Sequence, residues 1–165
     1  MKVYCYSKRD FERVAAKNGW SDANPPVDWA VISICCKPEV VDNLLNGDDS
    51  HYFAANHENV LNVEFDDITQ DVEHISDPGV GFTAYGLDNK TAKRIVNFID
   101  SHAGMDFMVH CRAGKSRSQA VVRYITDTYD GYDETNPDNP CQFPNIHTLN
   151  KLKKARFGKT YEQDS

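Results

Sequence analysis

Four stretches of the chain have the apolar patterns of β-strands. Residues 29–36 form a continuous apolar, β-branched run, which is typical of a strand covered on both faces. Residues 60–65 alternate apolar and polar positions, as in a strand, and the apolar residues within 106–110 indicate a further buried strand. Residues 3–6 predict a short strand at the edge of a sheet.

Apolar residues between these strands recur at helical spacing. Ser7 and Asp10 form a capping box ahead of a helix that ends by Gly19. The other predicted helices cover residues 39–45, 88–104, 116–125 and 145–157.

Strands that alternate with helices imply parallel crossover connections. We therefore expect an α/β fold with a central, mostly parallel sheet of about four to five strands, flanked by helices. At this length the chain predicts a single domain over residues 1–165, with its core at 29–127. Residues 69–87 predict a long loop, and a turn-rich loop with a basic helix follows the core over residues 130–157.

Composition narrows the classes of function. The net charge of −7 argues against nucleic acid as a partner and against stable membrane association. No apolar segment approaches the roughly 20 residues needed to span a bilayer, and the N-terminus has no signal-peptide core. We expect a cytoplasmic protein.

The cysteines do not form a recognisable framework. Their number, five, is odd, and no two of them have the Cys-x-x-Cys spacing. This pattern favours reduced thiols over disulfides or a zinc site, so no metal is expected.

One loop concentrates the candidate chemistry. Cys111 and Arg117 bracket a loop that follows an apolar strand and precedes a helical pattern, with Gly114 at its turn. The loop carries the cations Arg112, Lys115 and Arg117 and no acid. A loop of this kind presents backbone N–H groups and the positive end of a helix dipole to an anion. The pattern predicts a phosphate-binding loop that contains a thiol.

The residue types in this loop suit nucleophilic attack on phosphorus. Converging amides, the helix N-terminus and Arg117 favour Cys111 as a thiolate, which is the reactive form. Arg117 can grip two phosphoryl oxygens with its planar fork. Ser118 can donate a hydrogen bond to the leaving thiolate, and we expect His110 to orient the loop through its ring hydrogen bonds. The predicted phosphate-binding residues are Arg112, Ala113, Gly114, Lys115, Ser116 and Arg117.

A nucleotide-binding Walker loop does not fit the same stretch. That motif requires a glycine five residues before Gly114, where the chain has Val109.

The stretch His110-Cys-Arg-Ala-Gly-Lys-Ser-Arg-Ser118 resembles the His-Cys-x5-Arg-Ser/Thr signature of the cysteine-dependent protein tyrosine phosphatases. The size and the late cysteine resemble the small dual-specificity branch, and the Phe-Asp-Asp-Ile spelling at 65–68 resembles its bacterial and phage members. The resemblance covers residues 29–127. It implies a phosphocysteine intermediate on Cys111, phosphate held by Arg117 and the loop amides between the last core strand and a helix, and no metal or cofactor.

The resembling family also uses an aspartic acid on a loop after an earlier strand as general acid. Matching the family's strand and acid to this chain favours Asp67, with Asp66 as the competitor. Both lie at the carboxyl end of a predicted strand, the edge at which ligands bind in such folds.

Cys35 and Cys36 end another predicted strand near this rim. In phosphoinositide-phosphatase relatives a cysteine in this region can pair reversibly with the catalytic one, so either residue is a candidate partner of Cys111. Packing in the core is the alternative for both.

The resemblance predicts a phosphomonoester hydrolase that acts on phosphoprotein, with phosphotyrosine or dual specificity. Inositol phosphates or phosphoinositides are the second class of substrate, because Arg112 and Lys115 match basic loop positions in those relatives. RNA 5′-phosphates are the third. A non-catalytic phosphate-binding module is the alternative from another functional class.

Overall fold

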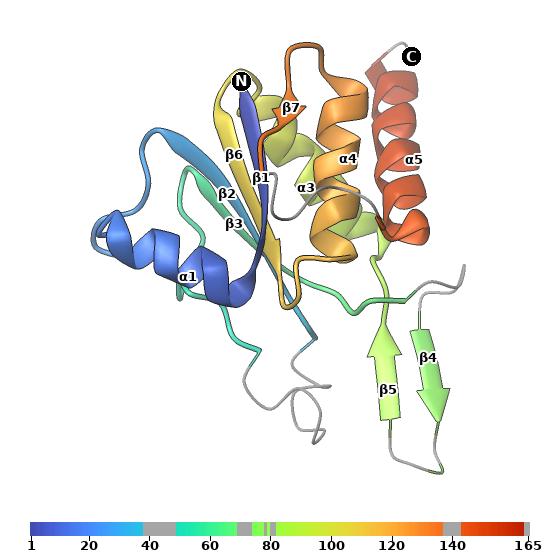
Figure 1. Cartoon of the computed structure of the whole chain (residues 1–165). Helices are drawn as coiled ribbons and strands as arrows, with labels where there is room; N and C mark the ends of the chain where they lie inside the picture. The colour runs from blue at the N-terminus through green and yellow to red at the C-terminus, as the bar shows by residue number, and fades with distance from the viewer. Residues whose placement is uncertain (38–48, 69–73, 78, 80–81, 137–142, 164–165) are drawn as a thin grey trace.

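A five-stranded sheet forms the centre of the computed structural model, which describes residues 1–37, 49–68, 74–77, 79, 82–136 and 143–163 (Figure 1). The strand order is β3-β2-β6-β1-β7, and every neighbouring pair runs parallel. The strands are β1 (Lys2–Ser7), β2 (Trp29–Cys35), β3 (Val60–Glu64), β6 (Asp106–Cys111) and β7 (Asp133–Glu134). The predicted α/β fold is confirmed.

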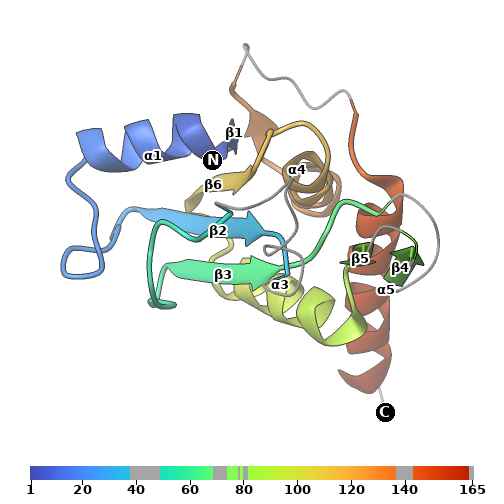
Figure 2. The same cartoon turned by 90° about the horizontal axis from the view of Figure 1, so that it is seen from below.

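Helices cover both faces of the sheet (Figures 1 and 2). Helix α1 (Lys8–Lys17) packs on β1 and β6 from one face. Helices α3 (Asn89–Ser101) and α4 (Arg117–Thr128) cover the other face, and α5 (Ile146–Gln163) packs on both of them. Successive residues of a strand point to opposite faces of the sheet, so each strand contributes side chains to both helical layers.

The two faces bury separate apolar clusters. The larger cluster lies between the sheet and helices α3, α4 and α5, and includes Ile32, Val109 and Ile125. The smaller one lies under α1 and joins Phe11 to Met108. Burial of such side chains is the main stabilising contribution to the fold.

Two predictions about the strands are wrong. The strand at residues 3–6 is not at an edge, because β1 lies between β6 and the two-residue β7. The predicted loop at 69–87 contains β4 (His74–Asp77) and β5 (Phe82–Tyr85), an antiparallel hairpin separate from the main sheet. Each strand of the hairpin has four residues, which is too short for a clear alternating pattern.

The predicted helices over 88–104, 116–125 and 145–157 correspond to α3, α4 and α5, and α5 extends further than expected, to Gln163. The predicted helix at 39–45 lies outside the described residues. Ser7 caps α1 as expected, since its Oγ accepts a hydrogen bond from the Asp10 amide. Among the described residues, no helix is long and apolar enough to cross a membrane.

The carboxyl ends of the parallel strands lie along one rim (Figure 1). Ser7 at the end of β1 is the register partner of Cys111 at the end of β6. Strands β2 and β3, which pair with each other, end at Cys35 and Glu64. The residues that follow these strands therefore form one continuous edge, where ligands bind in open α/β sheets.

Candidate active site

Cys111 lies at the junction between β6 and the loop that leads into α4. The residue is 2% exposed. Its Sγ accepts a hydrogen bond of 3.2 Å from the backbone N–H of Gly114 and lies 3.1 Å from Ser118 Oγ. Both groups can therefore donate a hydrogen bond to this sulfur.

Gly114 determines the path of the loop. Its φ of +69° is in the left-handed region, and a Cβ built there would lie 2.6 Å from the Ser7 nitrogen and 2.7 Å from the Tyr6 carbonyl carbon. Neither backbone atom can yield, so glycine alone permits this turn. The loop is also fixed by a 3.1 Å hydrogen bond from the Lys8 amide to the Arg112 carbonyl.

Ser116 is the N-cap residue of α4, but its side chain makes no capping hydrogen bond. The hydroxyl instead donates to Asp67 Oδ1 at 2.7 Å. The first N–H groups of a helix have no partner within the helix. The arrangement leaves this end of α4 without its serine cap and suited to an anion.

Arg117 is 6% exposed, and its guanidinium contacts the backbone just after β3. Its Nη1 donates to the Phe65 carbonyl at 2.8 Å and lies 3.7 Å from Cys36 Sγ. Burial alone would lower the pKa of the guanidinium, but the surrounding Cys111, Cys36 and Asp67 outweigh burial and raise it. Arg117 is therefore a fixed cation within electrostatic reach of both the thiol and the candidate acid.

Asp67 lies against the loop that follows Cys111. Its exposed carboxylate accepts two hydrogen bonds at Oδ1, from Ser116 Oγ at 2.7 Å and from Asn145 Nδ2 at 2.6 Å. Asn145 also donates to the Ile68 carbonyl at 2.9 Å and accepts from the Thr148 amide at 3.0 Å. One asparagine thus joins the start of α5 to the acid.

Asp66 points elsewhere and is buried, with 6% exposure. Its Oδ2 accepts a 2.6 Å hydrogen bond from the Tyr85 amide, and its Oδ1 accepts one of 3.3 Å from the Lys37 amide. Its own amide donates to the Tyr85 carbonyl at 2.6 Å. These contacts connect β5 to the end of β3. The structure brings Asp67, and not Asp66, to the loop.

His110 does not make the ring hydrogen bonds that we expected. Among the described residues, neither ring nitrogen has a hydrogen-bond partner, and the buried ring stacks on Phe11 with centroids 4.5 Å apart. Burial lowers the pKa of His110 to about 3. The Cys111 backbone is close enough to offset part of that shift, but it does not have hydrogen-bonding geometry to either ring nitrogen. His110 supports the loop by packing as a neutral ring.

Cys35 and Cys36 occupy different surroundings. Cys36 Sγ faces Arg117, whereas Cys35 Sγ lies 3.4 Å from His51 Nδ1. Burial, reinforced by Asp49, raises the pKa of each thiol to about 12. Asp49 keeps a lowered pKa despite burial, because the Cys36 amide donates to its Oδ2 at 2.6 Å. Oxidative pairing of Cys111 with Cys35 or Cys36 stays a prediction.

Cys5 contacts Ser118 in the candidate site, and the sequence pattern did not indicate this contact. Its thiol donates to Ser118 Oγ at 3.2 Å and is 3.6 Å from the Gly114 carbonyl oxygen. With Cys5 as donor, the Ser118 hydroxyl hydrogen is left to point at Cys111 Sγ. Cys5 lies on β1 and Ser118 on α4, so only the packing of these elements reveals the relationship.

In the described part of the chain, no group of three or more His, Cys, Asp or Glu side chains is placed to hold a metal ion. The structure brings together four of the predicted site residues, which are Cys111, Arg117, Ser118 and Asp67. Asn145, which the sequence analysis did not single out, also belongs to the site because it donates to Asp67.

Comparison with known proteins identifies no relative of this chain. No protein-family model matches the chain, and neither the curated proteins nor the solved structures contain a significant match. Membership of the cysteine-dependent phosphatases therefore stays a prediction from the residues of the loop.

Proposed function

We propose that this protein is a phosphomonoester hydrolase that acts through a phosphocysteine intermediate on Cys111. The observation that carries the proposal is the position of Cys111 Sγ between the Gly114 N–H and the Ser118 hydroxyl, at the start of α4, with Arg117 buried beside it. This combination places two hydrogen-bond donors at the nucleophile and a buried cation beside it, which suits the binding of a phosphoryl group.

In the first step the Cys111 thiolate attacks phosphorus in line with the ester oxygen. The S–P bond forms as the P–O bond to the leaving group breaks, and Arg117 with the loop amides holds the three remaining phosphoryl oxygens. Asp67 gives its proton to the leaving oxygen, so that a neutral alcohol or phenol departs. Among the described residues, both hydrogen bonds that Asp67 accepts are at Oδ1, so Oδ2 is the oxygen that would carry the proton.

In the second step a water molecule attacks phosphorus and Asp67, now a carboxylate, takes its proton. The P–S bond breaks, inorganic phosphate forms, and Cys111 leaves as thiolate. Ser118 stabilises that leaving group, because its hydroxyl lies 3.1 Å from the sulfur. The cycle returns every group to its starting protonation state.

Phosphoprotein is the substrate class we propose, with phosphotyrosine or dual specificity. Inositol phosphates and RNA 5′-phosphates are the alternatives. Comparing turnover of phosphotyrosine peptide, phosphothreonine peptide, soluble inositol phosphates and 5′-phosphorylated RNA ranks these classes directly.

A generic aryl phosphate tests the activity itself. Wild-type protein should release phosphate, whereas Cys111→Ser should be inactive and still bind the phosphate ester. If wild-type protein binds the ester without turning it over, the protein is a phosphate-binding module and the proposed hydrolase is wrong.

A further inference from the structure

Gln119 is a buried polar residue of α4 that contacts the anion loop, which we define as residues 111–117. It is 2% exposed, and its Nε2 donates a 3.0 Å hydrogen bond to the Gly114 carbonyl. Its Oε1 accepts one of 3.0 Å from the Phe143 amide. We propose that Gln119 is a positioning residue for phosphate binding, because through the Gly114 carbonyl it holds the Lys115 N–H toward the phosphoryl group. The inference rests on the proposed function and specifies how its loop is held.

The geometry of one peptide links Gln119 to the anion. A trans peptide is planar, and its C=O and N–H point in opposite directions. The Gly114 carbonyl belongs to the same peptide as the Lys115 N–H. Since Gln119 binds this carbonyl from outside the anion loop, the N–H points to the inside of the loop. Backbone N–H groups that converge in this way form an anion site.

The carbonyls two residues before and two residues after Gly114 are held in the same way. The Arg112 carbonyl accepts a 3.1 Å hydrogen bond from the Lys8 amide, which begins α1. The Ser116 carbonyl accepts one of 3.0 Å from the Asn145 amide, just before α5. Both donors lie outside the anion loop. Alternate carbonyls that point outward leave the N–H groups of the same peptides pointing inward.

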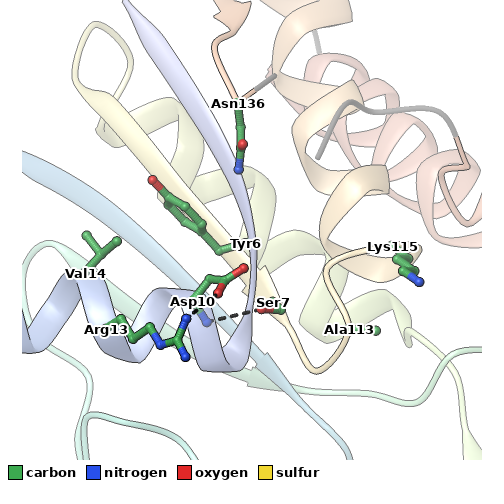
Figure 3. Close-up of a pocket in the computed structure, with 8 residues that line it drawn as sticks. All are labelled: Tyr6, Ser7, Asp10, Arg13, Val14, Ala113, Lys115 and Asn136. Carbon is green, nitrogen blue, oxygen red and sulfur yellow. Dashed lines mark hydrogen bonds and ion pairs between the residues drawn. The ribbon is translucent and has the colours of Figure 1, made fainter. Parts of the chain in front are cut away.

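Gly114 is the position at which such a contact matters most. A Cβ there would lie 2.8 Å from the Tyr6 carbonyl oxygen, so the close approach of β1 restricts the residue to glycine. Figure 3 shows Tyr6 lining a hollow of about 570 Å³ together with Ala113 and Lys115 of the anion loop. Without a Cβ, glycine has more backbone conformations than any other residue. The hydrogen bond from Gln119 therefore fixes a peptide that its own residue type does not fix.

The two partners of Gln119 determine the orientation of its side-chain amide. The Gly114 carbonyl requires a donor and the Phe143 N–H requires an acceptor, so only one of the two amide orientations satisfies both. Cys5 Sγ is also 3.6 Å from the Gly114 carbonyl oxygen, but a thiol is a weak donor. Gln119 lies one residue beyond the signature that the chain resembles, so the resemblance assigns it no role.

Titration of isotope-labelled protein with inorganic phosphate, followed by amide spectra, tests the inference at single N–H groups. In wild type the signals of Ala113, Lys115 and Arg117 should shift, because each N–H shares a peptide with an outward carbonyl. Gln119→Met keeps a similar length and removes the donor. In this variant the Lys115 shift should shrink several-fold, while the shifts of Ala113 and Arg117 remain.

Binding and turnover provide a second measurement on the same variant. Inorganic phosphate should bind Gln119→Met about 10-fold more weakly than wild type, because one hydrogen bond to a charged group is lost. The value of kcat/KM should fall by the same factor for aryl and alkyl phosphates, since both present the same phosphoryl group. This pattern distinguishes Gln119 from a residue that acts on the leaving oxygen.

Asn62 offers a matched control outside the anion loop. It is a buried residue of β3, 8% exposed, whose Nδ2 donates a 2.9 Å hydrogen bond to the Phe53 carbonyl. Asn62→Leu therefore removes a buried hydrogen bond of the same kind. In urea denaturation it should lose stability as Gln119→Met does, but its affinity for phosphate should equal that of wild type.

The inference is wrong if the Lys115 signal of wild type does not respond to phosphate, whether or not any variant folds. It is also wrong if Gln119→Met keeps the wild-type affinity for phosphate or loses the response of all three amides together. Equal weakening of phosphate binding in Asn62→Leu would likewise overturn it. A protein that binds phosphate in the expected pattern without hydrolysing an aryl phosphate would contradict the proposed function alone.

Discussion

Asp67 and Ser116 are joined by a 2.7 Å hydrogen bond between Oδ1 and Oγ, although 49 residues separate them in sequence. This contact connects the end of β3 to the catalytic loop. It also explains why the N-cap residue of α4 does not cap its own helix. The Ser116 hydroxyl therefore helps to hold the candidate acid and leaves the N-terminus of α4 available to an anion.

The exchange of Asp67 for asparagine tests the acid assignment. Asp67→Asn should lower kcat about 100- to 1,000-fold for alkyl phosphates, because their leaving oxygen requires a proton. The loss should be much smaller for an aryl phosphate whose phenol is a good leaving group. Steady-state rates over a series of leaving groups measure the difference.

Asp66→Asn is the matched control for Asp67→Asn. Since the Asp66 carboxylate binds the Tyr85 and Lys37 amides, this variant should lose stability and keep the leaving-group dependence of the wild type. Should Asp66→Asn show the steep dependence instead, the acid would be Asp66.

Asn145 positions the acid. Asn145→Ser keeps a side chain that can cap α5 but loses the amide donor that reaches Asp67 and Ile68. We expect turnover of alkyl phosphates to fall about 10-fold, with aryl phosphate turnover nearly unchanged. An equal fall for both substrates would indicate a general disturbance of the site.

Gly114 and Gly19 form a natural pair for testing the loop. Both have positive φ, +69° and +70°, but a Cβ meets the Ser7 backbone at 2.6 Å in the first case and nothing within 4 Å in the second. Gly114→Ala should reduce the free energy of unfolding by about 3 kcal/mol or more and abolish turnover. Gly19→Ala should cost only about 1 kcal/mol and leave turnover intact. Urea denaturation measures both, and equal costs would contradict the close packing of the loop on β1.

His110 makes stability depend on pH. Its pKa is about 3 when folded and near 6.5 when unfolded, so unfolding takes up a proton between these values. The unfolded state binds more protons in this window, and stability therefore rises with pH across it. The wild type should lose about 2 kcal/mol from this group between pH 7 and pH 5.

His110→Phe should remove that loss while keeping the stack on Phe11. Chemical denaturation at pH 5, 6 and 7 compares the two proteins in a range where the carboxylates stay ionised. Parallel slopes for the two proteins would show that His110 is not the titrating group.

The sequence was sufficient to predict the elements whose signals are local. The strand ending at Cys111, the turn at Gly114 and the helix after it follow from one continuous stretch. The parallel sheet follows from the alternation of strands and helices.

Features that depend on distant contacts could not be predicted in the same way. The resemblance favoured Asp67 over Asp66, but the physical reason was not visible in the sequence, because the Asp66 carboxylate is held by the Tyr85 amide of β5, a strand that was not predicted. Asn145 reaches Asp67 across 78 residues. His110 and Phe11 come from different elements, and their stack exists only because α1 packs on β6.

The central claim is that Cys111 becomes covalently phosphorylated during turnover. Rapid acid quenching of wild-type protein with substrate, followed by peptide mass mapping, tests it most directly. The account predicts one added phosphoryl group on the peptide containing Cys111, more of it in Asp67→Asn with an aryl phosphate, and none in Cys111→Ser. Full turnover by Cys111→Ser, or a phosphoryl group found only on another residue, would contradict it.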